Sequence, residues 1–201
     1  MSEENHTASP SAEHRAESHN EHEQNIMLRF TQREDLPDIM YMVNAAKQTL
    51  KVDGSSQWQN GYPNEYSFIA DMDAQSSYVL TLNSQVVATA SISYGEEAGY
   101  SSLRSGQWHY PEDVFGTYAV LHRVAVHPDF HGQGIVDKLF TELCEVIKQQ
   151  NIRAVRVDTH RKNQRMQHVL SRSGFELSGE ITIDHDPVDP IRLCYEKLLD
   201  E

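Results

Sequence analysis

The sequence is poor in the residues that mark several large classes of protein. Only two residues are cysteine, Cys144 and Cys194, and no CxxC pair occurs, which argues against a disulfide framework or a zinc ribbon. No apolar run reaches the ~18 residues of a membrane span, and no apolar segment of a signal peptide occurs near the first residue. We therefore expect a cytoplasmic protein without a membrane partner, in which both cysteines are reduced packing residues.

Basic residues are also scarce, with 17 Lys and Arg against 30 Asp and Glu and a net charge of −13. Such a surface repels a phosphate backbone, so no nucleic-acid partner is expected. Residues 1–25 hold six acids and no aromatic or large aliphatic residue after Met1, and we expect a disordered tail. Its four histidines leave metal binding open, but their spacing matches no helix face, and no metal site is predicted. They are His6, His14, His19 and His22.

Periodicity and turn residues predict one domain over residues 26–201. Helices are expected at 35–52, 64–72, 134–150 and 163–173. Strands are expected at 26–30, 77–82, 85–94, 118–126, 154–158, 175–183 and 191–198, with a long Gly/Ser/aromatic loop at 95–116. This alternation predicts an α+β (mixed α/β) fold, with helices on both faces of a mixed sheet.

The segment Val124–Val136, V-A-V-H-P-D-F-H-G-Q-G-I-V, combines a strand, a glycine turn and a helix start. Pro128 must end the strand because proline cannot donate to a ladder. The two glycines of the turn permit a tight backbone and remove Cβ atoms that would block a ligand. Amide groups at a helix N-terminus suit phosphate oxygens. The sequence thus predicts a pyrophosphate site made by His131, Gly132, Gln133, Gly134, Ile135 and Val136.

This turn is neither a P-loop nor a GxGxxG loop, because no Gly-Lys-Ser/Thr occurs and residue 137 is Asp. The run Asp129–Gly134 resembles the Gln/Arg-x-x-Gly-x-Gly/Ala signature of the GCN5-related N-acetyltransferases (GNAT). Asp129 replaces the leading Gln/Arg. A second signature of that family, Asn at a helix start with Gly-Phe about a dozen residues on, is matched by Asn163 and Gly174-Phe175.

The resemblance covers roughly residues 26–200 and implies a central mixed, mostly antiparallel sheet of six to seven strands flanked by about four helices. It implies acetyl-CoA as co-substrate, no metal, and transfer to a primary amine of a small molecule or peptide by direct attack in a ternary complex. The pantetheine arm is expected to pair with the backbone of Val124, Ala125 and Val126, with the Val126 amide stabilising the thioester oxygen. Asn163 completes the expected cofactor-binding residues.

His122 is the first candidate for the base that deprotonates the amine, since imidazole titrates near pH ~6.5. It lies two residues from Val124, and strand alternation predicts the same side for both. The arylalkylamine branch of the family carries a histidine at the matching place. Glu176 is a second candidate, and a merely packed His122 is the alternative.

Leu170 occupies the position where many family members have a tyrosine that protonates the leaving thiolate. Water, Ser171 or Tyr195 could take that part instead. Leu170, Asp129 and Val136 favour the alternative function, a non-catalytic acyl-CoA-binding sensor or regulator on the same fold. A homodimer is left open.

Two further patterns concern the cofactor and the acceptor. Residues 153–175 carry six bases against one acid, which suits either a basic rim for the phosphates of CoA or a solvated helix face. Polar and aromatic residues at 57–63 and 107–110 suit an acceptor pocket, or a cap on the sheet. Asp184, Asp186 and Asp189 could attract a cationic amine or form a solvated acidic turn.

Overall fold

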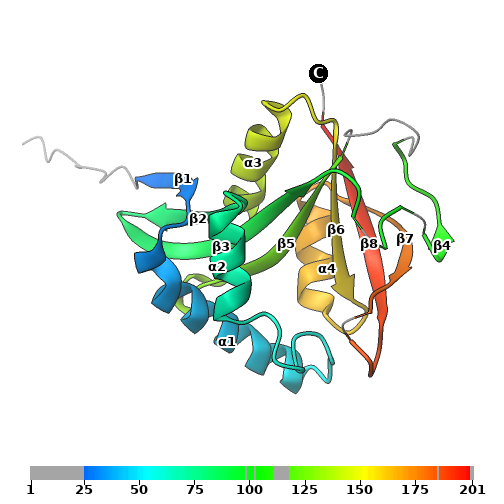
Figure 1. Ribbon diagram of the computed structural model, residues 1–201, viewed down its shortest axis with the longest axis horizontal. Coiled ribbons are helices and arrows are strands. Elements are labelled where there is room, and N and C mark those ends of the chain that lie inside the picture. Colours follow the sequence, from blue (N-terminus) through cyan, green and yellow to red (C-terminus); the bar gives the residue numbers. More distant parts are fainter. Residues whose placement is uncertain (1–24, 98, 102, 111–117, 185, 200–201) are drawn as a thin grey trace, which may run out of the picture.

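The computed structural model describes residues 25–97, 99–101, 103–110, 118–184 and 186–199, so the expected tail lies outside the described residues apart from Asn25. These residues form one sheet with the order β1-β2-β3-β5-β6-β8-β7-β4, in which β5 and β6 are parallel and the other pairs antiparallel (Figure 1). The strands are β1 (Ile26–Phe30), β2 (Ser77–Leu82), β3 (Gln85–Tyr94), β4 (Ser105–Gly106), β5 (Tyr118–Val126), β6 (Ala154–His160), β7 (Glu176–Thr182) and β8 (Ile191–Leu198).

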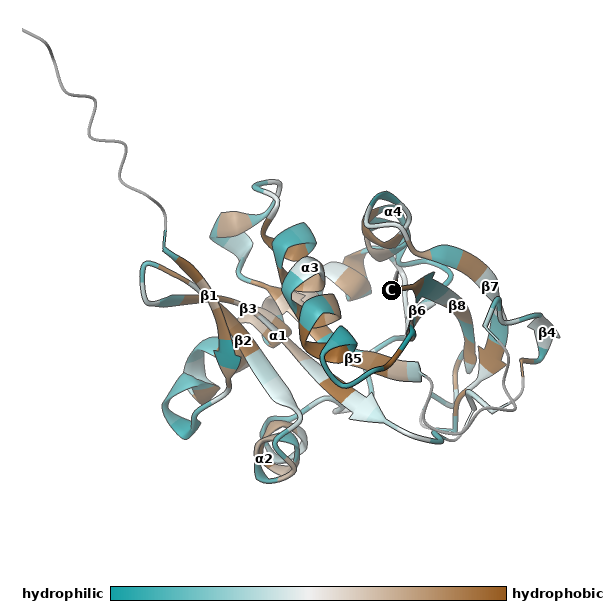
Figure 2. Ribbon diagram, turned by 90° about the horizontal axis from the view of Figure 1, so that it is seen from above, coloured by the Kyte–Doolittle hydropathy of each residue, from teal (hydrophilic) through white to brown (hydrophobic). Residues whose placement is uncertain are grey.

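The helices are α1 (Leu36–Val52), α2 (Glu65–Asp73), α3 (Ile135–Lys148) and α4 (Gln164–Arg172), with short 3-10 turns at Arg33–Asp35 and Pro128–Phe130. Figure 2 shows α3 and α4 on the face of the sheet opposite α2. Buried residues of α1 and α2 form one apolar cluster, and those of α3 and α4 belong to another. The predicted α+β class, the mostly antiparallel mixed sheet and the helices on both faces are confirmed.

The sequence of α3 shows why this helix could be predicted from the spacing of its apolar residues. Its buried residues recur every three or four positions, which gives one apolar stripe along the helix. Cys144 belongs to that stripe, and Cys194 is fully buried on β8. Both thiols are free, and burial raises the pKa of Cys144 to about 11. The prediction that both are reduced packing residues is confirmed.

Strand β4 was not predicted, since residues 95–116 were expected to form one loop. Its two residues pair with Gly179 and Glu180 of β7. The backbones of β4 and β7 approach each other closely. A Cβ atom on Gly179 would lie 1.9 Å from the carbonyl oxygen of Ser105, and one on Gly106 would lie 2.1 Å from that of Ser178. Glycine in both strands, Gly106 in β4 and Gly179 in β7, makes this pairing possible.

The parallel pair β5–β6 opens part-way along its length. Its register runs from Tyr118 opposite Ala154 to Leu121 opposite Val157 and then ends. Beyond that point β5 stays paired with β3, and β6 stays paired with β8 as far as His160. The two central strands therefore diverge, and one backbone edge of β5 has no strand beside it.

A β-bulge lies on β5 at this opening. Two residues, Arg123 and Val124, stand opposite the single residue Ala90 of β3, and Arg123 has a left-handed φ of 53°. The bulge breaks the alternation of sides. Val124 shares an apolar cluster with Leu121, whereas His122 contacts the ring of Tyr100 on the other face. The prediction that strand alternation puts His122 and Val124 on one side is therefore wrong.

The guanidinium of Arg156 is buried, although its segment was interpreted as either a basic rim or a solvated helix face. It is 1 % exposed and lies between the rings of Trp108 and Tyr118, 3.9 Å from each centroid. Its Nε donates to Glu196 Oε1 at 2.9 Å, while Glu196 Oε2 accepts from the amides of His109 and Tyr110. Arg156 is thus a core residue. Together with Glu196 it holds residues 108–110 against the sheet. Trp108 is buried there too and caps the sheet.

Candidate active site

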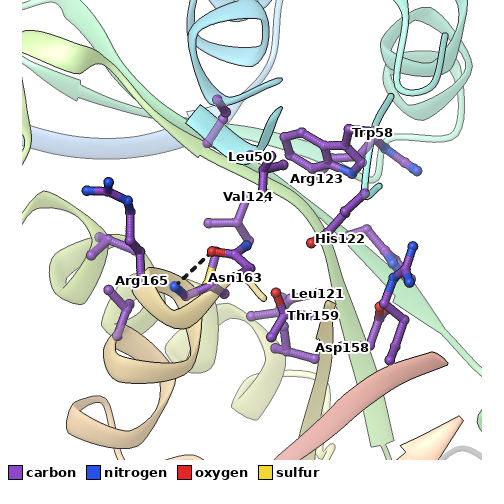
Figure 3. Close-up of a pocket in the computed structure, with 18 of the residues that line it drawn as sticks. Leu50, Trp58, Leu121, His122, Arg123, Val124, Asp158, Thr159, Asn163 and Arg165 are labelled. Carbon is purple, nitrogen blue, oxygen red and sulfur yellow. Dashed lines mark hydrogen bonds and ion pairs between the residues drawn. The ribbon is translucent and has the colours of Figure 1, made fainter. Parts of the chain in front are cut away.

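A cavity of about 820 Å³ occupies the opening between β5 and β6. Its walls come from the C-terminal half of α1, the segment after it, the far end of β3, the outer half of β5, the glycine turn and α4 along its length. In Figure 3, Trp58 and His122 lie on one side of the cavity and Arg165 on the other, with Val124 and Asn163 between them. The cavity thus joins both faces of the sheet.

The glycine turn forms one end of the cavity. Gly132 and Gly134 both have a φ of +76°, a left-handed conformation that favours glycine. A Cβ atom on Gly132 would meet nothing within 4 Å, so the space beside the turn is open. The first bond within α3 runs from the Lys138 amide to Gly134 O at 3.0 Å, which leaves the preceding amides without a helical carbonyl. This end suits an anionic ligand.

Five of the six predicted pyrophosphate residues line the cavity, namely His131, Gly132, Gly134, Ile135 and Val136. Gln133 does not, because its side-chain amide donates back to Asp129 O at 2.8 Å. That bond closes the turn over Asp129, at the position where the family signature has Gln/Arg. The side chain of Gln133 therefore serves the turn itself.

Two bases of the segment 153–175 reach the cavity, Arg165 and Arg172. Arg172 donates twice to Asp137 in the first turn of α3, at 2.9 and 2.8 Å, and Arg165 contacts Asp53 at 3.2 Å. Asn163 caps α4, with Oδ1 accepting from the Met166 amide at 3.2 Å (Figure 3). The expected basic rim consists of these two arginines, and both are ion-paired.

The unpaired edge of β5 connects the glycine turn to the opening. Val124, Ala125 and Val126 line the cavity, and their edge toward β6 carries no ladder. Such an edge fits an extended ligand rich in amides, which would add to the sheet as a further strand. The chain runs from the opening toward the glycine turn, so Val126 lies nearest the turn and Val124 nearest the opening.

His122 forms a pair with Glu97, a residue that the sequence did not single out. His122 Nε2 lies 2.8 Å from Glu97 Oε2, and the Ser93 hydroxyl donates to the same oxygen at 2.6 Å. Burial alone would raise the pKa of Glu97, but the bonds from His122 and Ser93 lower it below its usual range. An ionised carboxylate can only accept, so Nε2 of His122 is the donor in this bond, and the acceptor of the ring in its neutral form is Nδ1.

Glu176 is not brought to this site. Its side chain on β7 is 80 % exposed, lies 3.9 Å from His109, and does not line the cavity. Neither do Leu170, Ser171 and Tyr195. Leu170 is fully buried in the core cluster beneath α4, so an aliphatic side chain packs where many family members have a tyrosine.

The end of the cavity away from the glycine turn is lined by polar, aromatic and acidic side chains. Gln57, Trp58, Asn60 and Tyr62 line it, as the acceptor-pocket interpretation of residues 57–63 requires. Asp158 lines it too, and its Oδ1 accepts from the hydroxyl of Tyr100 at 2.6 Å.

The arginines at this end are already paired. Arg123 binds Asp71 through two nitrogens and also donates to the Tyr62 hydroxyl. Arg192 donates to Asp186 at 2.7 Å. Burial would raise the pKa of Asp186, but bonds from Arg192 and Ser56 lower it to about 2. Asp189 pairs with Arg161 at 2.7 Å. Two acids of the terminal turn, Asp186 and Asp189, thus serve ion pairs.

Comparison with known proteins identifies the architecture. The Acetyltransferase (GNAT) family profile matches residues 43–175. A GNAT-family acetyltransferase from Streptococcus agalactiae is similar in structure, with a TM-score of 0.77 and 28 % identity over 88 % of this chain and 96 % of that one. No curated protein matches the chain.

Two structures with bound ligands have the same fold. They are yncA of Salmonella typhimurium with its cofactor acetyl-CoA (TM-score 0.59, 18 % identity, 88 % and 95 % covered) and PaiA N-acetyltransferase of Thermoplasma acidophilum with coenzyme A (0.61, 15 %, 87 % and 99 %). No helix among the described residues is long and apolar enough to cross a bilayer. Since the family profile spans more than half of the chain, the protein belongs to the GNAT family of acetyltransferases.

Proposed function

We propose that the protein transfers an acetyl group from acetyl-CoA to a primary amine of a small molecule or peptide, by direct attack in a ternary complex. One observation carries the proposal: a single cavity holds the open glycine turn, the unpaired edge of β5 and the His122–Glu97 pair. The turn binds the pyrophosphate, the edge binds the pantetheine arm, and the pair lies where an amine would reach the thioester.

In the proposed reaction the ammonium form of the acceptor first gives a proton to Nδ1 of His122, because only a neutral amine is nucleophilic. The C–N bond then forms, and the carbonyl electrons move onto oxygen, which accepts a hydrogen bond from a β5 amide. We assign that donor to Val124 rather than Val126, because Val126 lies at the phosphate end of the strand. The carbonyl then re-forms as the C–S bond breaks, the electron pair of that bond leaves with sulfur, and the nitrogen loses its second proton to solvent.

The acceptor end favours an amine by its charge. Glu97 and Asp158 line it as carboxylates, and both arginines there are already ion-paired, Arg123 with Asp71 and Arg192 with Asp186. An alkylammonium ion in solution is attracted by such a surface. Trp58 and Tyr62 add aromatic area for the rest of the acceptor.

A non-catalytic acyl-CoA sensor is the second candidate, favoured by the buried Leu170 and by Asp129 in the signature turn. Thiol release from acetyl-CoA across a panel of diamines, amino acids and peptides separates the two functions. Turnover with any amine supports the enzyme. Tight acetyl-CoA binding without turnover on every acceptor supports the sensor.

Substitution of Gly134 by valine should weaken acetyl-CoA binding at least tenfold, ~1.4 kcal/mol. Valine at a left-handed position strains the turn and puts methyl groups beside the open space. Calorimetry measures the affinity. The matched control is Gly95→Val, which is also left-handed, with nothing within 4 Å of its Cβ, but does not line the cavity. Equal affinities of the two folded variants would refute the phosphate site.

Substitution of Glu97 by glutamine should lower kcat/KM by roughly tenfold and move the acidic limb of the pH–rate profile to lower pH. The reason is that the protonated imidazole of His122 loses its counter-charge when the carboxylate becomes an amide. Glu176→Gln is the control, since that side chain is exposed. An acidic limb unchanged by Glu97→Gln would argue that the pair has no part in proton transfer.

A further inference from the structure

One polar group at the cavity is buried without a partner. Thr159 on β6 is 0 % exposed, and no described residue hydrogen-bonds to its Oγ1. An unsatisfied buried hydroxyl destabilises a protein, so such groups call for an explanation. Thr159 also lines the cavity and is labelled in Figure 3. A ligand in the cavity can therefore supply the missing partner.

The position of Thr159 indicates which part of a ligand it meets. Val155 and Val157 of β6 face the core cluster under α3 and α4, and alternation puts Thr159 on that same side. The last parallel pair is Leu121 with Val157. Continuing that register by two residues puts Thr159 across the gap from Arg123, beside Val124. It therefore lies at the opening, away from the glycine turn at the far end of β5.

An acyl-CoA arm that follows the free edge of β5 starts at the glycine turn, next to Val126, and extends toward the opening. The phosphates remain at the turn, and the sulfur end arrives near Val124. The group that faces Thr159 is thus the sulfur rather than a phosphate.

We propose that the hydroxyl of Thr159 donates a hydrogen bond to the sulfur of CoA and stabilises the thiolate as it leaves; this inference rests on the proposed function. As the C–S bond breaks, its electron pair becomes a lone pair on sulfur, and the amine proton stays on His122. Thr159 keeps its own proton, because an alcohol is a far weaker acid than a thiol. The thiolate is later protonated by solvent. Thr159 thereby stabilises the leaving thiolate, which the aliphatic side chain of Leu170 cannot do.

The test compares Thr159→Val, which removes only the hydroxyl, with Thr159→Ser, which retains it. Calorimetry at roughly pH 7 and pH 9.5 measures binding of CoA and of desulfo-CoA, which lacks the sulfur, on either side of the thiol pKa of ~8.5. For Thr159→Val we expect at least a tenfold loss of CoA affinity at the higher pH, where the thiolate binds. Desulfo-CoA affinity should be unchanged, and Thr159→Ser should behave as the wild type.

A second measurement separates this role from a structural one. Because the hydroxyl is unsatisfied in the free protein, Thr159→Val should unfold at the same temperature as the wild type or higher. Equal CoA affinity of Thr159→Val and wild type at both pH values overturns the inference. An equal loss for CoA and desulfo-CoA also overturns it, by assigning the hydroxyl to the pantetheine arm. A wild type that binds neither ligand instead overturns the proposed function.

Discussion

Replacement of His122 by glutamine should lower kcat/KM by about 10²-fold, the lower range for loss of a general base. Glutamine can still donate to Glu97 but cannot accept the amine proton at neutral pH. Acetyl-CoA affinity should be unchanged, because the phosphate site is at the other end of the cavity. The acidic limb that an imidazole gives to the pH–rate profile should disappear.

The matched control is His109→Gln. His109 also lies beside carboxylates, those of Glu176 and Glu196, but it is more exposed than His122 and does not line the cavity. Its substitution should leave kcat/KM within a factor of about two. If a well-folded His122→Gln variant kept wild-type rates at roughly pH 6 to 8, His122 would have no part in the mechanism, and water would be the proton acceptor.

Replacement of Glu196 by glutamine should lower the free energy of unfolding by about 3 kcal/mol, the cost of leaving a buried charge without its partner. Arg156 is 1 % exposed, its Nε donates to Glu196, and its Nη2 has no hydrogen-bond partner among the described residues. The faces of Trp108 and Tyr118 compensate only in part. Urea unfolding measures the change.

The control for this pair is the double variant Arg156→Met/Glu196→Gln, which removes both charges and keeps an acceptor for the amides of His109 and Tyr110. It should recover most of the lost stability, because replacing a buried pair as a whole is far milder than breaking it. A single variant as stable as the wild type would mean that solvent reaches Arg156.

Local patterns predicted the parts of the site that depend on local physics. The glycine turn was readable because proline, two glycines and an amphipathic helix follow within one short segment, each with its own backbone requirement. Asn163 was identified through the second family signature, as an Asn at a helix start, and its Oδ1 caps α4. The order of strands and helices could be predicted from the spacing of apolar residues along each segment.

The parts that were missed depend on contacts between distant residues. Glu97 is 25 positions from His122 in a segment with no periodicity, and only the fold brings the two together. Counting charges along the chain predicted a basic rim or a solvated helix face for the segment of Arg156, because a charge count contains no information on the two rings that enclose this side chain. The bulge at Arg123 depends on pairing with β3, which single-strand alternation does not contain.

Under the proposed function, Arg123 at the bulge also restricts how the acceptor end of the cavity can change. Arg123 joins the central strand to α2 through Asp71 and to the segment after α1 through Tyr62. A shorter or longer segment after α1 would displace Tyr62 and leave a mostly buried guanidinium with fewer partners. The proposed acceptor end can therefore change most readily by exchange of lining side chains such as Gln57 and Trp58 on a fixed backbone. Insertions and deletions, the usual route to new specificity in loops, are disfavoured at this one.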